Sequence, residues 1–166
     1  MVLDSIKNAT TKRRAGVYLH LTSLPGPYGI GEIGAAARDF VDTMRAMELS
    51  VWQFLPLGPT AYGDSPYQPL STFAGNEMLV DIGDLMRLGL LSDDEVAELA
   101  TLPERYVDYG TLIPIKNRLL NLAASRFDSV VGDDILNDFK GFLERNDDGW
   151  LHDYAVFRIL KSKHGE

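Results

Sequence analysis

Gly16-Val17-Tyr18-Leu19-His20-Leu21 is a nearly continuous run of apolar and aromatic residues, and a second such run, Val51-Trp52-Gln53-Phe54-Leu55, follows further along the chain. Both runs predict short buried strands. Between them, apolar residues recur at helical spacing opposite charged ones, which predicts an amphipathic helix. The apolar positions are Ile33, Ala36, Ala37, Phe40, Val41, Met44 and Met47. Strand, helix and strand in this order predict a βαβ unit with parallel strands and a right-handed crossover.

The segment after the second strand is a long loop. From Pro56 to Glu77 the chain reads PLGPTAYGDSPYQPLSTFAGNE, which has no helical or strand period. A loop of this length in a compact domain is usually functional or disordered, and its three aromatic rings, Tyr62, Tyr67 and Phe73, favour a functional loop. A short strand is predicted from Met78 to Ile82.

The rest of the chain has helical patterns. Ser92-Asp93-Asp94-Glu95 is a capping box that predicts a helix to about Ala100. Further helices are predicted from Pro114 to Phe127, from Asp133 to Arg145 and from Trp150 to about Lys163. The sequence thus divides into a lead-in (1–13), a βαβ unit with its loop (14–83) and a helical subdomain (84–166).

Composition narrows the classes of function. The chain has 166 residues, 45% of them apolar, which is enough for one domain with a core. It has no cysteine, which excludes disulfides and thiolate metal sites, and its three scattered histidines cannot supply a usual zinc site. A formal net charge of −8 disfavours nucleic acid, and Lys12-Arg13-Arg14 is too short a basic run to reverse that. Without a long apolar run, we expect a soluble, cytoplasmic protein, and neutral polyols remain open as substrates.

Gly29-Ile30-Gly31-Glu32-Ile33-Gly34 has the GxGxxG spacing of dinucleotide-binding loops. Two details disfavour that function. The segment from Thr22 to Tyr28 separates the glycines from the first strand, and the only candidate for a ribose-binding acid, Glu48, precedes the second strand. The alternative interpretation is a glycine-rich start of the helix.

A second motif, Tyr62-Gly63-Asp64-Ser65-Pro66-Tyr67-Gln68, lies beyond the carboxyl end of the second strand, where barrel enzymes hold their active sites. An aromatic plane for the apolar face of a hexose and short polar groups for its hydroxyls would make a sugar site. An ordinary turn capped by Asp64, with Tyr67 packed at the barrel mouth, is the alternative. Other residues are open to two interpretations: His20 as a site or core residue, Tyr106 and Tyr109 as stacking or core residues, and Asp81 and Asp84 as acids or helix caps.

Several ordered segments resemble the amino-terminal part of amylomaltases, the disproportionating 4-alpha-glucanotransferases of the alpha-amylase clan. The resemblance extends from about residue 14 to the end, and one departure is Leu21, where relatives frequently have proline. The segments that carry it are Leu19–Gly31, Trp52–Thr60, Tyr62–Gln68, Phe73–Asn76, Val107–Gly110, Ile113-Pro114, Lys116 and Trp150–Ala155.

The resemblance implies an α/β fold in which this chain forms part of a (β/α)8 TIM barrel with a helical insertion. It also implies a glycosyltransferase that moves α-1,4-glucan segments between maltooligosaccharides by retaining double displacement, with no cofactor and no metal. Tyr67 would stack on the sugar next to the scissile bond, with Asp64 and Ser65 beside it. The substrate-binding residues expected on both grounds are Tyr62, Asp64, Ser65, Tyr67, Gln68 and, in a supporting role, His20.

The family's catalytic carboxylates lie on later barrel strands, beyond Glu166. We therefore expect the chain to be an N-terminal part that lacks them, is inactive alone, and self-associates through its incomplete barrel. Two alternatives stay open: a non-catalytic glucan-binding module, and a nucleotide-binding domain that uses Gly29, Gly31 and Gly34.

Overall fold

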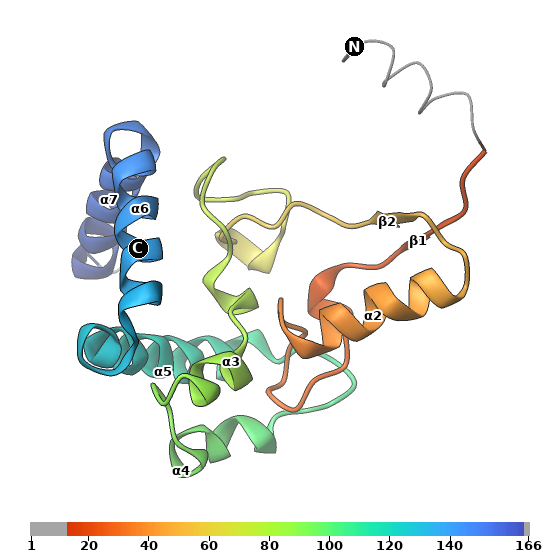
Figure 1. Ribbon diagram of the computed structural model, residues 1–166, viewed down its shortest axis with the longest axis horizontal. Coiled ribbons are helices and arrows are strands. Elements are labelled where there is room, and N and C mark those ends of the chain that lie inside the picture. The colour runs from red at the N-terminus through yellow and green to blue at the C-terminus, as the bar shows by residue number, and fades with distance from the viewer. Residues whose placement is uncertain (1–12, 165–166) are drawn as a thin grey trace.

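The computed structural model describes residues 13–164 and begins with a small parallel sheet (Figure 1). Strands β1 (Gly16–Tyr18) and β2 (Val51–Gln53) pair in parallel, and Val17 lies opposite Trp52. Helix α2 (Ala35–Ala46) connects them. The predicted βαβ unit and its parallel strands are therefore confirmed, whereas the handedness of the crossover stays a prediction.

Helix α2 packs on one face of the sheet through aromatic side chains. The rings of Phe40 and Trp52 meet edge to face, with centroids 4.8 Å apart. The indole nitrogen of Trp52 donates a hydrogen bond of 2.8 Å to the carbonyl of Leu19. These contacts explain why the apolar stripe of α2 faces the strands.

Both strands are shorter and more exposed than predicted. The chain leaves β1 after Tyr18 and forms a 3-10 turn, η1 (Leu21–Ser23), which the His20 side chain caps by accepting from the amide of Thr22. Tyr18 is 60% exposed. Full burial of the strands was a wrong prediction, because α2 covers only one face of a sheet that has two strands in the described part of the chain.

The loop from 56 to 77 folds back on itself. It contains a short turn, η2 (Tyr62–Asp64), and an antiparallel bridge between Thr60 and Pro69. Its end is fixed to its beginning, since the amide of Asn76 donates to the carbonyl of Leu57 at 2.8 Å. The loop is therefore held by its own hydrogen bonds.

The predicted strand from Met78 to Ile82 is wrong. The chain forms η3 (Glu77–Leu79) and then helix α3 (Ile82–Arg87). The side chain of Asn76 accepts from the amide of Met78 at 2.9 Å, and that of Asp81 accepts from the amide of Asp84 at 2.7 Å. Two capping side chains within this short segment favour helical turns over an extended strand.

The remaining chain is helical, as predicted, with one boundary in error. Helix α5 starts at Tyr109 and not at Pro114, because Asp108 caps it by accepting from the amide of Thr111 at 3.2 Å. The capping box is confirmed, with the amide of Ser92 donating to Glu95 at 2.9 Å. The elements are α4 (Asp93–Val96), η4 (Ala97–Thr101), α5 (Tyr109–Val130), α6 (Asp133–Asn146), a π-helical turn η5 (Asp147–Leu151) and α7 (His152–His164).

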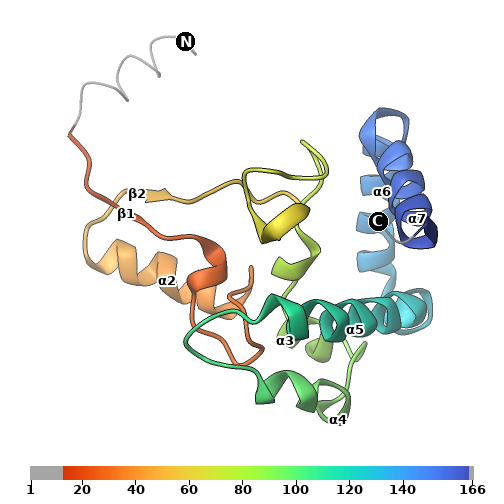
Figure 2. The same cartoon turned by 180° about the vertical axis from the view of Figure 1, so that it is seen from behind.

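The main core joins the glycine-rich segment, α3, α4 and α5. Its buried residues include Ile30 from the glycine-rich segment, Ile82 from α3, Leu99 from η4, and Leu112 and Leu119 from α5. Helices α6 and α7 stand as a pair beyond the end of α5, away from the sheet (Figures 1 and 2). No helix in the described part of the chain is long and apolar enough to cross a membrane.

Candidate functional site

A cavity of about 220 Å³ lies where the chain leaves the two strands. Five segments form its walls: η1, the residues after β2, the loop, η3 and the first residue of α5. The lining residues are His20, Thr22, Ser23, Leu55, Pro56, Leu57, Thr60, Asp64, Pro66, Asn76, Leu79 and Tyr109. This is the carboxyl end of a parallel strand pair, the place where ligands bind in α/β proteins.

His20 connects the ends of the two strands. Its Nδ1 lies 2.8 Å from the hydroxyl of Thr22 and 3.4 Å from the amide of the same residue, while Nε2 lies 3.5 Å from the carbonyl of Pro56. A backbone amide can only donate, so Nδ1 is the acceptor and the neutral ring carries its proton on Nε2, facing Pro56. The geometry gives His20 a supporting role in the cavity wall.

Asp64 is the one carboxylate among the described lining residues. Gly63 and Asp64 both have positive φ, 66° and 54°, a conformation that Gly adopts freely and Asp tolerates better than most residues. Burial raises the pKa of the neighbouring Tyr109, a hydrogen bond with Thr22 opposes the rise, and the charge of Asp64 adds to it. Asp64, Thr22 and Tyr109 therefore approach one another in the cavity from three different segments.

The turn after Asp64 presents an exposed aromatic ring. The hydroxyl of Ser65 accepts from the amide of Tyr67 at 3.3 Å, and the amide of Gln68 donates to the carbonyl of Ser65 at 3.3 Å. Tyr67 is 68% exposed. Desolvation raises the pKa of Tyr18, and the phenol of Tyr67 raises it further.

The six predicted binding residues thus occupy different places. His20 and Asp64 line the cavity, while Ser65, Tyr67 and Gln68 form the adjacent turn. The backbone of Tyr62 lies in η2, and its side chain is outside what the structure describes.

The sequence did not predict the other polar lining residues as binding residues, namely Thr22, Ser23, Thr60, Asn76 and Tyr109. Tyr109 lay in a segment that resembles the family, but its pattern favoured core packing over a stacking role. The Asp108 cap that starts α5 at Tyr109 was the available signal. Tyr106, the other ring with two interpretations, is 67% exposed and lies outside this cavity.

A larger cavity, of about 590 Å³, lies between α2 and the segment from Leu24 to Glu32. Of its three acidic groups, two have partners within the chain, since Glu32 pairs with Lys116 and Asp81 caps α3, and the third, Asp39, lies on the exposed side of α2. We therefore assign the candidate site to the smaller cavity, whose polar groups converge at the strand ends. Within residues 13–164, no three His, Cys, Asp or Glu side chains are grouped so as to hold a metal ion.

The glycines of the GxGxxG segment are explained by packing. Gly29 has φ +74° and lies against Leu102. A Cβ on Gly31 would lie 2.0 Å from the carbonyl oxygen of Leu21, and one on Gly34 would lie 1.2 Å from the carboxylate of Asp81. Since the chain's own atoms fill the space around the glycines, the structure favours the glycine-rich helix start over a nucleotide loop.

Asp81 and Asp84 have structural partners. Asp81 is the N-cap of α3, and Asp84 pairs with Arg87 and lies 3.7 Å from Arg38. Both therefore fit the helix-cap and surface interpretation.

Comparison with known proteins gives a consistent result. A family model described as 4-alpha-glucanotransferase matches residues 19–166. The 4-alpha-glucanotransferase of Thermus thermophilus is 43% identical over 153 residues, covering 92% of this chain and 30% of that protein. The chloroplastic/amyloplastic 4-alpha-glucanotransferase of Solanum tuberosum is 38% identical over 160 residues, covering 93% and 27%.

The structure also has a solved neighbour. The amylomaltase from Streptococcus agalactiae in complex with acarbose superimposes with a TM-score of 0.83 at 35% sequence identity, covering 93% of this chain and 30% of that one. The chain therefore spans about 30% of the length of the relatives it matches. Because the family model covers most of the sequence and the fold agrees, the chain belongs to the 4-alpha-glucanotransferase family.

Proposed function

We propose that this chain supplies one wall of the glucan site of a 4-alpha-glucanotransferase, an enzyme that transfers α-1,4-glucan segments between maltooligosaccharides by retaining double displacement. The observation that carries the proposal is the convergence of Asp64, Tyr109 and His20 on a cavity at the strand ends, beside the exposed ring of Tyr67. Aromatic planes and short polar groups are what a hexose requires. The structurally similar amylomaltase from Streptococcus agalactiae is in complex with acarbose, which supports the same ligand class.

We propose further that β1, α2 and β2 are the first βαβ unit of a (β/α)8 barrel. The parallel register supports this, as does the position of the cavity at the carboxyl ends of the strands. The division into a βαβ part up to residue 83 and a helical part after it belongs to the same proposal. One core passes through both parts, from Ile30 to Val131.

The catalytic carboxylates are proposed to lie outside these 166 residues. A retaining mechanism needs two carboxyl groups about 5 Å apart. Asp64 alone supplies a carboxylate among the described residues that line the cavity. In the complete site, Tyr67 would stack on the sugar while Asp64 and Ser65 hold its hydroxyls, with Tyr62 and Gln68 as further contacts.

Calorimetric titration with maltotriose, paired with product analysis after long incubation, tests this function. We expect saturable weak binding and no glucose or longer maltodextrins. Absence of binding at millimolar maltotriose would remove the glucan site from the proposal. Disproportionation of maltotriose by this chain would show that it holds its own catalytic carboxylates.

A non-catalytic glucan-binding module is the second candidate, favoured by the single carboxylate in the cavity. The two functions differ in a protein of the relatives' full length, which would transfer glucan segments in the first case and only bind them in the second. If an extended protein that carries the relatives' full length binds maltotriose but never disproportionates it, the binding module is the better account.

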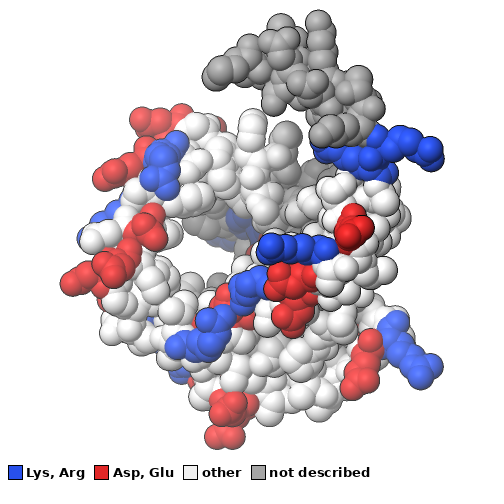
Figure 3. All heavy atoms as spheres, turned by 45° about the vertical axis from the view of Figure 1, so that its right-hand side comes forward, with Lys and Arg blue, Asp and Glu red and all other residues white. Residues whose placement is uncertain are grey.

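Maltooligosaccharides are thus the proposed partners, in a cytoplasmic setting. Nucleic acid is not expected, because the formal net charge is −8 and basic and acidic side chains are interspersed on the face shown in Figure 3.

A further inference from the structure

Glu32 and Lys116 form a buried ion pair that the proposed function does not use. The side chain of Lys116 is 0% exposed and that of Glu32 is 8% exposed. Burial raises the pKa of Glu32, and the positive charge of Lys116 opposes this rise. Burial lowers the pKa of Lys116, and the negative charge of Glu32 opposes this fall. A buried pair of this kind persists when further hydrogen bonds satisfy both groups.

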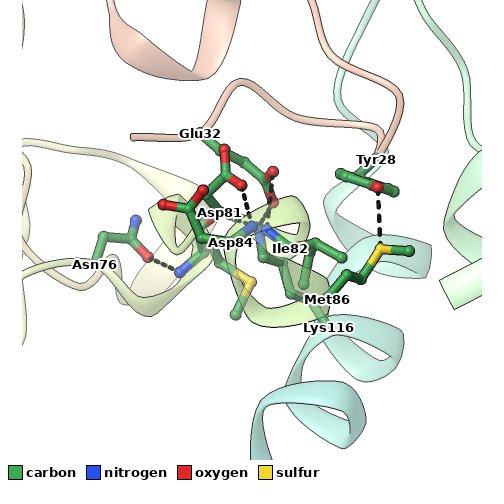
Figure 4. A network of polar contacts seen from close by, with 9 residues as sticks. Tyr28, Glu32, Asn76, Asp81, Ile82, Asp84, Met86 and Lys116 are labelled. Carbon is green, nitrogen blue, oxygen red and sulfur yellow. Dashed lines mark hydrogen bonds and ion pairs between the residues drawn. The ribbon is translucent and has the colours of Figure 1, made fainter. Parts of the chain in front are cut away.

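Those further hydrogen bonds reach backbone groups next to the candidate cavity (Figure 4). The ammonium of Lys116 donates to the carbonyl of Met78 at 2.7 Å, and the second carboxylate oxygen of Glu32 accepts from the amide of Ile82 at 3.2 Å. The amide of Met78 in turn donates to the side chain of Asn76, which lines the cavity. Lys116 therefore holds the turn that places Asn76.

The residues on either side of Glu32 extend these contacts to two walls of the cavity. The amide of Gly31 donates to the carbonyl of Thr22 at 3.1 Å, on the η1 wall. The amide of Ile33 donates to the carbonyl of Leu79 at 2.8 Å, on the η3 wall. A side chain at Gly31 would collide with Leu21, so the glycine permits this close approach.

A third wall is connected through helix α5. Tyr109, which lines the cavity, and Lys116 lie on the same helix, about two turns apart. Fixing Lys116 against Glu32 and Met78 therefore also fixes α5, and with it Tyr109, relative to the other two walls.

We propose that Glu32 and Lys116 are positioning residues for the candidate site, whose ion pair holds the η1, η3 and α5 walls of the cavity in register. The glycine-rich segment then acts as the support of this pair and not as a phosphate loop. The inference rests on the proposed function only for the identity of the ligand.

Amide hydrogen exchange by NMR on the 166-residue chain tests the proposal without any sugar. Glu32→Asp keeps the charge but shortens the side chain by one methylene, so it cannot reach both Lys116 and the amide of Ile82. Glu32→Gln with Lys116→Met removes both charges while keeping similar volumes. The reference is the amide of Ala123, a buried residue of α5, the helix that carries Lys116. In both variants we expect the ratio of the Ile33 and Asn76 exchange rates to the Ala123 exchange rate to rise at least about tenfold.

The matched control neutralises a second ion pair, which joins α4 to α5. Glu95→Gln with Arg126→Met removes a bidentate pair, with contacts of 2.7 and 2.9 Å, whose residues do not line the cavity. The control is expected to leave the ratio of the Ile33 and Asn76 rates to the Ala123 rate unchanged. If the Glu32 variants accelerate all three amides equally, the pair acts only on global stability and the proposal is overturned. Should the double variant fail to fold, Glu32→Asp carries the same test.

Maltotriose titration of the folded variants separates this inference from the proposed function. We expect affinity about tenfold weaker in Glu32→Asp than in the unaltered chain and unchanged affinity in the control. Faster exchange in a chain that never binds maltotriose would refute the glucan site and leave the positioning role intact. Unchanged relative exchange in a chain that does bind would refute the positioning role alone.

Discussion

Asp64 shows how backbone conformation and chemistry coincide at single residues of the site. It holds a left-handed conformation directly after Gly63, and this turn directs the chain toward Ser65 and Tyr67. The sequence motif from Tyr62 to Gln68 could be predicted as a site because its residue types suit a sugar. Its geometry could not, because the side chains that meet Asp64 in the cavity, those of Thr22 and Tyr109, come from segments distant in sequence.

Replacing Tyr67 by Ala tests the aromatic contact. Because the ring is 68% exposed, the free energy of unfolding should change by less than about 0.5 kcal/mol, while maltotriose affinity should fall about tenfold. Urea unfolding and calorimetry measure the two quantities. Tyr106→Ala is the matched control, because Tyr106 is 67% exposed and does not line the cavity. Equal losses of affinity in both variants would remove the special role of Tyr67.

At the scale of elements, local signals determined what could be predicted. The period of α2, the capping box at Ser92 and the helical patterns of α6 and α7 were sufficient to place those helices. The segment from Met78 to Ile82 was mistaken for a strand because its apolar residues fit both interpretations, and because the cap Asn76 was overlooked. Strand burial failed for another reason, since it depends on what covers the sheet and not on the strand itself.

The Glu95–Arg126 pair, which joins α4 to α5, predicts a pH dependence of stability. Hydrogen bonds from Arg126, more than any other cause, lower the pKa of Glu95 from 4.5 to about 2. A carboxyl group with a lowered pKa stabilises the fold above its ordinary pKa, and this contribution disappears as the pH falls toward 2. Glu95→Gln should therefore unfold at lower urea concentration than the unaltered chain at pH 6, and the difference should vanish near pH 2.

Glu98→Gln serves as the comparison, because its pair with Arg118 is more exposed and should contribute less to stability. If the urea midpoints of Glu95→Gln and the unaltered chain differ by the same amount from pH 6 to pH 2, the pair with Arg126 does not lower the pKa of Glu95.

Helix α5 should be the most sensitive element to core substitutions. Leu119 is fully buried in the main core, so Leu119→Ala should lower the free energy of unfolding by about 2–5 kcal/mol. Leu160→Ala, on the exposed face of α7, should cost much less. Urea unfolding of both variants measures the difference, and similar costs would mean that the core is not centred on α5.

At the scale of the whole molecule, apolar surface is distributed unevenly. The main core lies around α3, α4 and α5, while α6 and α7 contain no buried residue. Helix α7 exposes Val156, Phe157, Ile159 and Leu160, and both strands of the two-stranded sheet have a free edge within the described part of the chain. The sequence could predict the helices α6 and α7, but it could not predict that neither contains a buried residue.

This exposure predicts self-association. Sedimentation velocity should show the average mass rising with concentration, and Val156→Ser with Ile159→Ser, one turn apart on α7, should reduce it without loss of helix content. Lys163→Ser on the same helix is the control. A monomer at all concentrations, or equal association of the double variant, would contradict this expectation.

A glucan site at the strand ends requires that maltotriose bind against the residues that line the smaller cavity. NMR titration with maltotriose shows where the sugar binds, because each backbone amide reports separately. We expect saturable shifts at His20, Asn76 and Tyr109, which line the cavity, with the amides of α6 unmoved. Shifts centred on Tyr28 and Phe40 in the larger cavity, or no shifts at millimolar maltotriose, would contradict it.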